Sequence, residues 1–418
     1  MIEILLNEIA RRKEASGQFY YGGVGQTLRK RRLELNLTQE AVAIGICSNT
    51  YLSKIENNQI VVNREHLYLI MERMEMDMDK ITFPEEMLEY LERSIKLFFY
   101  RDVEGYRELF EEIDKYQFAV LLQIIKLGYY MLIEDSENAR LVYSETFRYL
   151  QSLEEFGFCV LLIYSSFYNI GIKDYKTART MIESVESRLF NDEMIYALYN
   201  YCKFLIYGNL HLQALAFESG QIAINIFNKQ SNITRINEMY LYREIFMVYE
   251  GSSSNNYINH NLLKYISNKE RNYYLIVLAT KSKNPVVYLE HLVPEGESYL
   301  LGLYLKARFY LLSEKIEEYK DTCNQINNIY YEISPKIDYV HVLKLMKNKE
   351  DIHLKEYLIN YALPMAFKNQ NLYFMKMITM TISNILSSKK RYKDALSYRQ
   401  KYDDFLLSLQ VKVEVSQK

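Results

Sequence analysis

The sequence predicts an all-α protein, and three observations support this class. Chain-breaking residues are scarce, because the 418 residues include only 14 glycines and 5 prolines. Apolar residues recur at i, i+3 and i+4, which is the spacing of one face of a helix. Helix pairs also recur roughly every 34 to 40 residues in the region after residue 84, as they do in proteins built from stacked helix pairs, although the later copies lose register.

The bulk composition limits the kinds of function that the chain can have. A length of 418 residues exceeds one ordinary core, so we expect two or more domains or a repeat array. Hydrophobic residues make up 49% and charged residues 25%, which is the composition of a globular protein. The net charge is −2, so any nucleic-acid-binding surface must be local.

No pattern in the sequence indicates an enzyme, a metal site or a bound cofactor. The cysteines are far apart and form no CxxC pair, which predicts free thiols without a disulfide framework: Cys47, Cys159, Cys202 and Cys323. The six histidines form no HExxH or HxH group, and no GxSxG or phosphate-binding glycine pattern occurs. We therefore expect no catalytic residue, no metal and no cofactor.

The distribution of apolar residues predicts a cytoplasmic protein that does not enter membranes. The first apolar stretch is interrupted by Glu3, Asn7 and Glu8, and no cleavage site of small residues follows it. The most apolar segment, residues 118–133, is interrupted by Gln123 and Lys126 and is too short to span a bilayer.

Three regions can be distinguished along the chain. Residues 1–21 form a short amphipathic extension of unknown role. Residues 22–80 carry a dense basic and polar motif. Residues 84–418 form a succession of helices, beginning at Pro84, which suits the first turn of a helix.

The motif of residues 22–80 begins with a basic amphipathic helix over residues 25–35. Leu28 and Leu35 are expected to face inward, with three basic residues outward: Arg29, Lys30 and Arg31. These are either phosphate contacts or a solvated basic face. Thr38 is expected to cap a second helix that begins at Gln39, and Gly45 marks the turn that follows.

The third helix of the motif is expected to begin after Ser48, which caps it. Leu52 and Ile55 would face the core at i, i+3. The side chains left on the outer face are Asn49, Thr50, Ser53 and Lys54. Amide, hydroxyl and ammonium groups on a short helix after a tight turn match the base edges of the major groove, so we expect this helix to read double-stranded DNA.

These residues resemble a known family. The run from Leu37 to Asn57 is similar to the Xre/Cro-type helix-turn-helix, and the segment GICSNTYLSKIE, residues 45–56, resembles the head of the RRNPP peptide-pheromone receptors. The resemblance implies base contacts by Asn49 and Thr50, with Lys54 one turn further on. It also implies a phosphate contact by Gln39 and a structural ion pair between Arg32 and Glu56.

The long C-terminal region contains an internal repeat with a period of 37 residues. The pairs Tyr164/Tyr201, Phe167/Phe204 and Gly171/Gly208 are each separated by this distance. A helix is expected to end near each glycine, and a second to follow over residues 173–189 and 212–227. Later pairs are expected at 299–312 with 314–331 and at 372–386 with 392–409, with a loop at 251–256.

Helix pairs at this period predict an α-solenoid of the tetratricopeptide type, a right-handed superhelix of about seven to nine pairs. Gly171, Tyr175 and Ala178 follow the tetratricopeptide pattern, but the consensus is degenerate elsewhere. Its concave groove is expected to hold a short linear peptide. Candidate contacts at multiples of the period, or next to them, are Lys126, Tyr164, Asn200, Tyr201 and Asn237. The alternative is that these residues, the tyrosines above all, belong to the core.

The sequence therefore predicts a DNA-binding transcription regulator, acting as a homodimer. The family resemblance implies control by a short secreted signalling peptide in quorum sensing. Two alternatives remain open: a repressor of a phage or mobile element, either arbitrium-like or independent of peptide, and an adaptor whose array inhibits a protein partner. For residues 1–21 the options are a swapped arm, a dimer contact or a mis-assigned start codon.

Overall fold

The structure is a computed structural model of the 418-residue chain. The residues that it describes are 2–14, 25–57, 60, 62–76, 84–116, 120–147, 150, 153, 155–185, 192–249, 263, 266–333, 352–368 and 372–410. Every regular element among them is a helix, so the predicted all-α class is confirmed. The expected loop at 251–256 lies outside the described residues.

The N-terminal head is a small helical domain with a core of its own. Its helices are α2 (Gly25–Glu34), α3 (Gln39–Ala43), α4 (Asn49–Glu56) and α5 (Arg64–Arg73). The three helices expected from the sequence begin at or within one residue of the predicted positions. Leu28, Val42 and Leu52 are fully buried, and they meet Ile70 and Met71 of α5. The fourth helix therefore closes a core that the first three leave open.

The array that follows is a succession of antiparallel helix pairs. It begins at Pro84, as predicted. Its helices are α6 (Pro84–Tyr100), α7 (Val103–Asp114), α8 (Val120–Leu132), α9 (Ser136–Thr146), α10 (Glu155–Gly171), α11 (Tyr175–Glu183), α12 (Glu193–Asn209), α13 (Gln213–Lys229), α14 (Ile233–Tyr249), α15 (Asn268–Lys281), α16 (Val286–Leu289), α17 (Gly296–Leu312), α18 (Ile316–Ile333), α20 (Ile352–Tyr357), η5 (Leu358–Ala362, a π-helical segment), α21 (Leu363–Lys368), α22 (Leu372–Ser388) and α23 (Tyr392–Gln410).

The helix ends agree with the predicted repeat. α10 ends at Gly171 and α12 ends one residue after Gly208, and each is followed by the second helix of its pair, α11 or α13. The later pairs α17 with α18 and α22 with α23 also lie where the sequence placed them, and each packs as a pair. The helix-pair architecture expected of an α-solenoid is thus confirmed.

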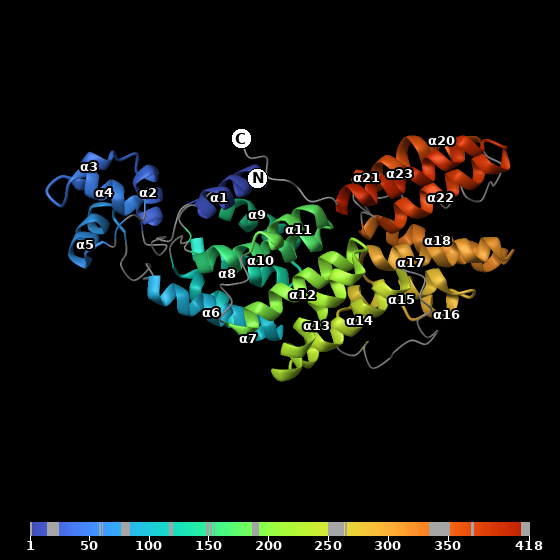
Figure 1. The fold of residues 1–418 in the computed structure, drawn as a ribbon, viewed down its shortest axis with the longest axis horizontal. Helices are drawn as coiled ribbons and strands as arrows, with labels where there is room; N and C mark the ends of the chain where they lie inside the picture. Colours follow the sequence, from blue (N-terminus) through green and yellow to red (C-terminus); the bar gives the residue numbers. More distant parts are fainter. Residues whose placement is uncertain are drawn as a thin grey trace.

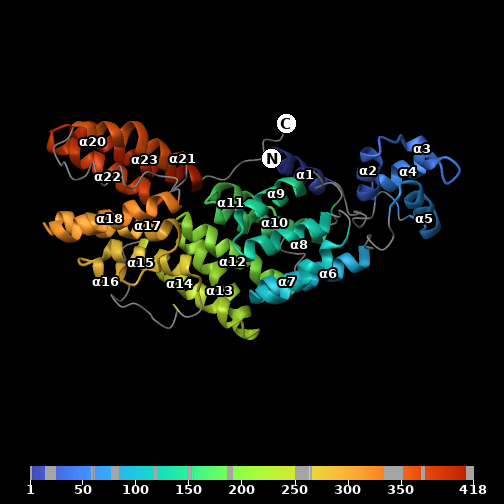
Figure 2. The same ribbon diagram turned by 180° about the vertical axis from the view of Figure 1, so that it is seen from behind.

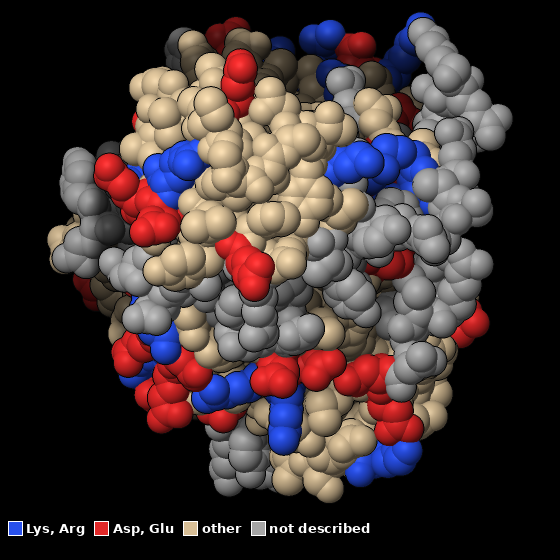
Figure 3. Space-filling model, turned by 90° about the vertical axis from the view of Figure 1, so that its left-hand side faces the viewer, with Lys and Arg blue, Asp and Glu red and all other residues tan. Residues whose placement is uncertain are grey.

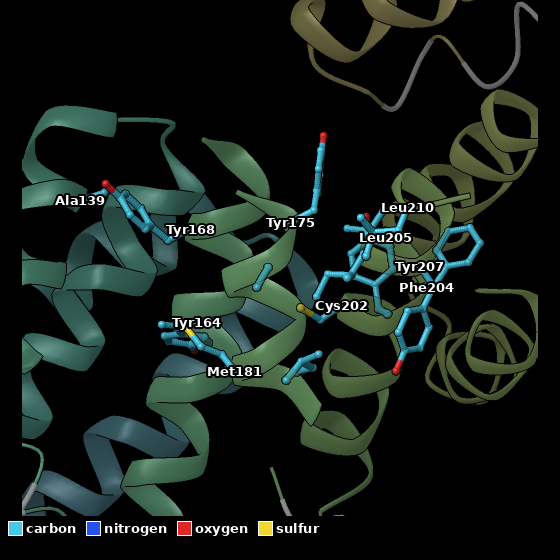
Figure 4. Packing of buried hydrophobic residues seen from close by; sticks show 14 of the residues in the cluster. Ala139, Tyr164, Tyr168, Tyr175, Met181, Cys202, Phe204, Leu205, Tyr207 and Leu210 are labelled. Carbon is cyan, nitrogen blue, oxygen red and sulfur yellow. The ribbon is translucent and has the colours of Figure 1, made fainter. Parts of the chain in front are cut away.

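A continuous apolar core runs through the array. α12 is buried on almost every side, because it packs against α6, α10, α13 and α14 at once. Figure 4 shows Tyr164, Met181 and Phe204 among the buried side chains of this region. α6 reaches beyond its neighbour α8 to contact α12 and α14, so the first helix of the array touches repeats much later in the chain.

The head lies at one end of the molecule, and α20–α23 lie toward the other (Figure 1). The view from behind gives the same arrangement (Figure 2). The helix α1 (Ile2–Glu14) precedes the head in sequence, yet it packs on the array beside α9. Across the described part of the chain, no helix has both the length and the apolar character needed to cross a membrane.

Candidate nucleic-acid interface

Helix α4 presents the side chains that the sequence assigned to DNA. Ser48 caps it, since its hydroxyl oxygen accepts a hydrogen bond from the Tyr51 backbone nitrogen at 3.1 Å. Asn49, Thr50 and Lys54 are exposed, as is Ser48 itself, and Ser53 is half-buried. The helix therefore offers one amide, hydroxyls and one ammonium group to solvent on its outward face.

The turn before α4 has the backbone that its glycine predicts. Gly45 has a φ of +74°, in the left-handed region that glycine adopts most readily. Thr38 caps α3 with a hydrogen bond from the Ala41 nitrogen to its hydroxyl oxygen at 3.1 Å. Both helices of the motif therefore begin at side-chain caps, which fixes the angle at which α4 leaves the turn.

A buried ion pair braces α2 against α4. Arg32 donates to Glu56 through two bonds, Nε to Oε1 at 2.6 Å and Nη2 to Oε2 at 2.9 Å. Glu56 is only 1% exposed, so the ion pair is buried. The same guanidinium donates to the Leu37 carbonyl oxygen at 2.9 Å. The contact expected from the family resemblance is thus present in the fold.

Gln39 takes part in this brace, which the sequence did not predict. Its Nε2 atom donates to Oε2 of Glu56 at 2.8 Å, so the amide group is oriented by the ion pair. Glu56 consequently holds one side chain from α2 and one from the start of α3. The phosphate contact expected of Gln39 remains a prediction. The side chain that would make it already donates a hydrogen bond to Glu56 through its amide nitrogen.

Arg73 is a second support that sequence reasoning missed. From α5, its Nη1 atom donates to the Val42 carbonyl oxygen at 3.1 Å and also to the Ile44 carbonyl oxygen. These carbonyls end α3 and begin the turn that leads to α4. A cation at the end of a helix satisfies carbonyls that lack intrahelical partners. Arg73 thereby ties the turn to α5.

The three basic residues that were predicted on the outer face of α2 do not form one free cationic face. Arg29 is exposed, and its Nη1 atom lies 3.5 Å from Oδ1 of Asn57. Lys30 lies 4.0 Å from Glu145 of the array, and Arg31 donates to the Met74 carbonyl oxygen at 3.1 Å. Arg29 is therefore the member of this group best placed to approach a phosphate.

Figure 3 views the molecule from the end that carries the head. Uncharged side chains cover most of the upper part of this face, with single acidic side chains among them and a group of lysines or arginines on either side. Acidic side chains also lie beside the left-hand basic group, and acidic and basic side chains alternate lower down.

The residues predicted to contact a peptide divide into two groups. Tyr164 is 1% exposed, and Asn200 and Tyr201 are each 2% exposed, so all three side chains are packed in the core. Figure 4 shows Tyr164 enclosed by neighbouring helices. Asn200 donates to the Tyr196 carbonyl oxygen at 2.8 Å within its own helix. In this structure these three residues do not line an open surface.

Lys126 and Asn237 are more accessible. Lys126 forms an ion pair with Asp114 at 2.6 Å, and 20% of its side chain is exposed. Asn237 is half-buried, and its Nδ2 atom is buried without a hydrogen-bond partner. An unsatisfied buried donor of this kind favours a ligand oxygen or a water molecule.

Next to Asn237 lies a buried cluster of four charged groups. Glu238 accepts from Arg235 at 2.9 Å, from Arg101 and from the Tyr201 hydroxyl. Glu270 lies 3.6 Å from Arg101. The cluster joins the end of α6 to α14 and α15, and its formal charges balance.

The pKa values of the two carboxylates in this cluster are shifted in opposite directions. Burial alone would raise the pKa of Glu238, but the charges of Arg235 and Arg101 outweigh it and lower that pKa below its ordinary value of 4.5. Burial raises the pKa of Glu270, and the negative charge of Glu238 raises it further. Glu238 is therefore the ionised partner of both arginines.

Comparison with known proteins supports both halves of the molecule. The helix-turn-helix family model matches residues 28–81. A search of curated protein sequences found no match. Among solved structures, the apo form of the quorum sensor NprR from B. thuringiensis superposes with a TM-score of 0.55 at 13% identity, over 78% of this chain and 99% of that one.

A Rap protein complexed with Competence and Sporulation Factor superposes with a TM-score of 0.59 at 10% identity, again over 78% of this chain and 99% of that one. At these identities the likeness establishes a shared fold. The fold and the head match therefore confirm the two-part architecture that the resemblance to the RRNPP receptors implied.

Proposed function

We propose that this protein is a transcription regulator of the RRNPP kind. Residues 22–80 would read a specific DNA sequence, and residues 84–418 would bind a short linear signalling peptide that controls the head. The observation that carries the DNA-binding half is α4, a capped and braced helix whose Asn49 and Thr50 side chains are exposed. The protein would act in the cytoplasm as a homodimer on a two-fold-related site.

In this proposal α4 enters the major groove. Asn49 and Thr50 would contact base edges, while Ser48 and Ser53 contact the backbone or adjacent bases. Lys54 would reach a guanine or a phosphate one turn later. Arg29 and Gln39 would contact phosphates and so fix the register of the head on the duplex. Arg32 and Glu56 keep α4 at a constant angle to α2 and take no part in contact.

The peptide-binding half of the proposal has a different support. The array shares its fold with NprR, which is described as a quorum sensor, and with a Rap protein that was crystallised with Competence and Sporulation Factor. Asn237, with its buried unpartnered Nδ2 atom, and Lys126 are the two residues that we retain as peptide contacts. A peptide that binds one arrangement of the repeats more tightly would shift the equilibrium between arrangements.

The test is fluorescence anisotropy with duplexes from upstream of the gene and its neighbours. Wild type is compared with an Asn49→Ala/Thr50→Ala double variant and with a Glu72→Gln control, which alters an exposed residue of α5. We expect salt-sensitive, sequence-specific binding that falls about tenfold or more in the double variant and persists in the control. If the double variant binds as tightly as wild type, the assignment of α4 is wrong.

The same assay tests the peptide. Synthetic peptides of about five to ten residues from small adjacent reading frames are added to the complex, a length that suits a groove ligand. We expect one of them to change the affinity for DNA, and an Asn237→Ala variant to respond more weakly. Binding to DNA that ignores every peptide would favour the peptide-independent repressor. Absence of specific DNA binding would favour the adaptor.

A further inference from the structure

Helix α1 belongs structurally to the array, although the head separates the two in sequence. Leu5 is fully buried and Ile9 is 5% exposed, and both join the core of the array rather than that of the head. Burying two such apolar side chains stabilises the docked helix. The extension is therefore a docked element in this structure.

Arg12 sits in a socket at the connection between α9 and α10. Its Nη2 atom donates to the carbonyl oxygens of Leu150 at 3.0 Å and Leu153 at 2.6 Å, and its Nη1 atom donates to Glu155 at 3.0 Å. The guanidinium lies 4.0 Å from the centre of the Phe158 ring. The socket thus supplies two carbonyls, one carboxylate and one aromatic face.

A carboxylate of α1 completes the arrangement. Glu8 is 4% exposed and accepts from Nε of Arg12 at 2.8 Å. Arg11, one residue away, also bonds Glu8, but 46% of its side chain is exposed. Only 4% of the Arg12 side chain is exposed. Two adjacent arginines therefore share one carboxylate, and one of them alone enters the array.

The head is consequently tethered to the array at both ends. Residues 15–24 connect it to α1, and residues 77–83 connect it to α6. α1 is docked at the connection between α9 and α10. α6 packs mainly on α8, and its C-terminal end also contacts α12 and α14, where Arg235 donates to the Phe98 carbonyl oxygen at 2.7 Å. The two tethers are thus attached to different elements of the array, the connection between α9 and α10 and the helix α6.

We propose that α1 is an anchor that positions the head, with Arg12 as its positioning residue. Because α1 is docked at the connection between α9 and α10 while the other tether continues into α6, a change in the stacking of α6 on these repeats would alter the orientation of the head. The ion pair between Lys30 and Glu145, at 4.0 Å, lies between the head and the same part of the array. This inference goes beyond the proposed function, since it assigns a role to the segment before the head.

The test uses the full chain without DNA or peptide, so its outcome is independent of the proposed function. Amide hydrogen exchange is measured for residues 2–14 in wild type, Arg12→Gln and Arg11→Gln. We expect protection in wild type, a loss of about tenfold or more in Arg12→Gln, and near-wild-type protection in the Arg11→Gln control. Protection of α12 and of residues 25–57 should be the same in all three.

A second measurement tests the effect on the head. Spin labels are placed through Glu72→Cys on α5 and Glu137→Cys on α9, in a Cys47→Ser/Cys323→Ser background, because the other two cysteines are buried. We expect one narrow distance distribution in wild type and in Arg11→Gln, and a broader one in Arg12→Gln.

Two results would overturn the proposal. The first is an α1 helix that stays protected in Arg12→Gln or is unprotected in wild type. The second is a loss of α1 protection that leaves the distance distribution unchanged, since α1 would then dock without positioning the head. Should Arg12→Gln fail to fold, Glu155→Gln removes only the ion pair of the socket, whose carboxylate is 35% exposed. It should give a smaller loss of protection in the same residues.

Discussion

The hydroxyl of Tyr201 donates to Oε2 of Glu238 at 2.9 Å, and the two residues are 37 positions apart, which is one period of the repeat. Both side chains are at most 2% exposed. Tyr201 and Glu238, which lies next to the candidate Asn237, are therefore bonded to each other between neighbouring pairs. At this place the period produces a contact that stabilises the stack, where the sequence suggested a surface for a ligand.

Variants at these two positions should differ strongly in stability. Tyr201→Phe removes one hydrogen bond but leaves Glu238 with both of its arginines, so we expect a loss of about 1 kcal/mol in the free energy of unfolding. Glu238→Gln leaves Arg235 without its buried counter-ion and Arg101 with Glu270 alone, which should cost about 3–5 kcal/mol. Urea denaturation, monitored through hydrogen exchange at α14, gives the loss in the free energy of unfolding for each variant. Equal losses would mean that the tyrosine, and not the charge, holds the cluster together.

Glu270, the second carboxylate of the cluster, predicts a pH dependence of stability opposite in sign to that of Glu238. The pKa of Glu270 is raised in the folded chain by burial and by Glu238. Its ionised form therefore costs stability above the folded pKa, and this cost disappears as the pH falls to 4.5, the ordinary value. Glu270→Gln removes this cost. The cap of the helix is kept, because an amide oxygen can also accept the hydrogen bond from the Ser267 nitrogen, which lies 2.9 Å from Oε2 of Glu270 in the wild type.

We therefore expect Glu270→Gln to melt at a higher temperature than wild type at pH 7. The difference should shrink as the pH is lowered toward 4.5. Thermal unfolding at several pH values, followed by circular dichroism, is sufficient to measure it. A variant that melts below wild type at pH 7 would show that the attraction of Arg101, 3.6 Å away, outweighs the burial of Glu270.

Local features of the head were predictable because they depend on residues close in sequence. The caps at Thr38 and Ser48 and the glycine turn at Gly45 follow from backbone chemistry within a few residues. The ion pair of Arg32 with Glu56 came from the family resemblance. The bonds of Gln39 to Glu56 and of Arg73 to the end of α3 required knowledge of which helices meet, which no local pattern contains.

The array shows the same division. Its helix boundaries were predictable because the 3.6-residue periodicity and the 37-residue repeat are properties of the sequence. The burial of Tyr164 was expected only as the alternative that places the tyrosines in the core, since it depends on α6, whose Phe98 ring lies 4.8 Å from the Tyr164 ring. The docking of α1 was missed for a related reason: its partners, from Leu150 to Phe158, lie about 140 residues away.

Two glycines at equivalent positions of the repeat should tolerate alanine differently. Gly171 has open space where a side chain would lie, with nothing within 4 Å. At Gly208 an added methyl group would overlap the ring of Phe246. Gly208→Ala should therefore cost about 1–3 kcal/mol through overpacking, while Gly171→Ala should be neutral or stabilise its helix by up to about 1 kcal/mol.

Thermal unfolding of the two single variants measures this difference, and each variant is the control for the other. Both substitutions add one methyl group near the end of the first helix of a pair, so intrinsic helix propensity changes equally. A comparable loss in both variants would contradict the packing around Gly208. Gly171 and Gly208, which are equivalent in the sequence repeat, would then also have equivalent surroundings in the structure.

The brace of the head separates loss of folding from loss of contact with DNA. Arg32→Met removes both ion-pair bonds to Glu56, a carboxylate that is 1% exposed and that also accepts from the amide of Gln39. We expect this variant to lose DNA binding together with hydrogen-exchange protection of α2 and α4, since removing one partner of a buried ion pair costs about 3–5 kcal/mol. Asn49→Ala removes an exposed side chain, so it should lose affinity while protection is kept. Anisotropy and hydrogen exchange on the same samples measure both properties. If Arg32→Met keeps its protection yet binds no DNA, Arg32 itself contacts the duplex, and its role as a purely structural partner of Glu56 is wrong.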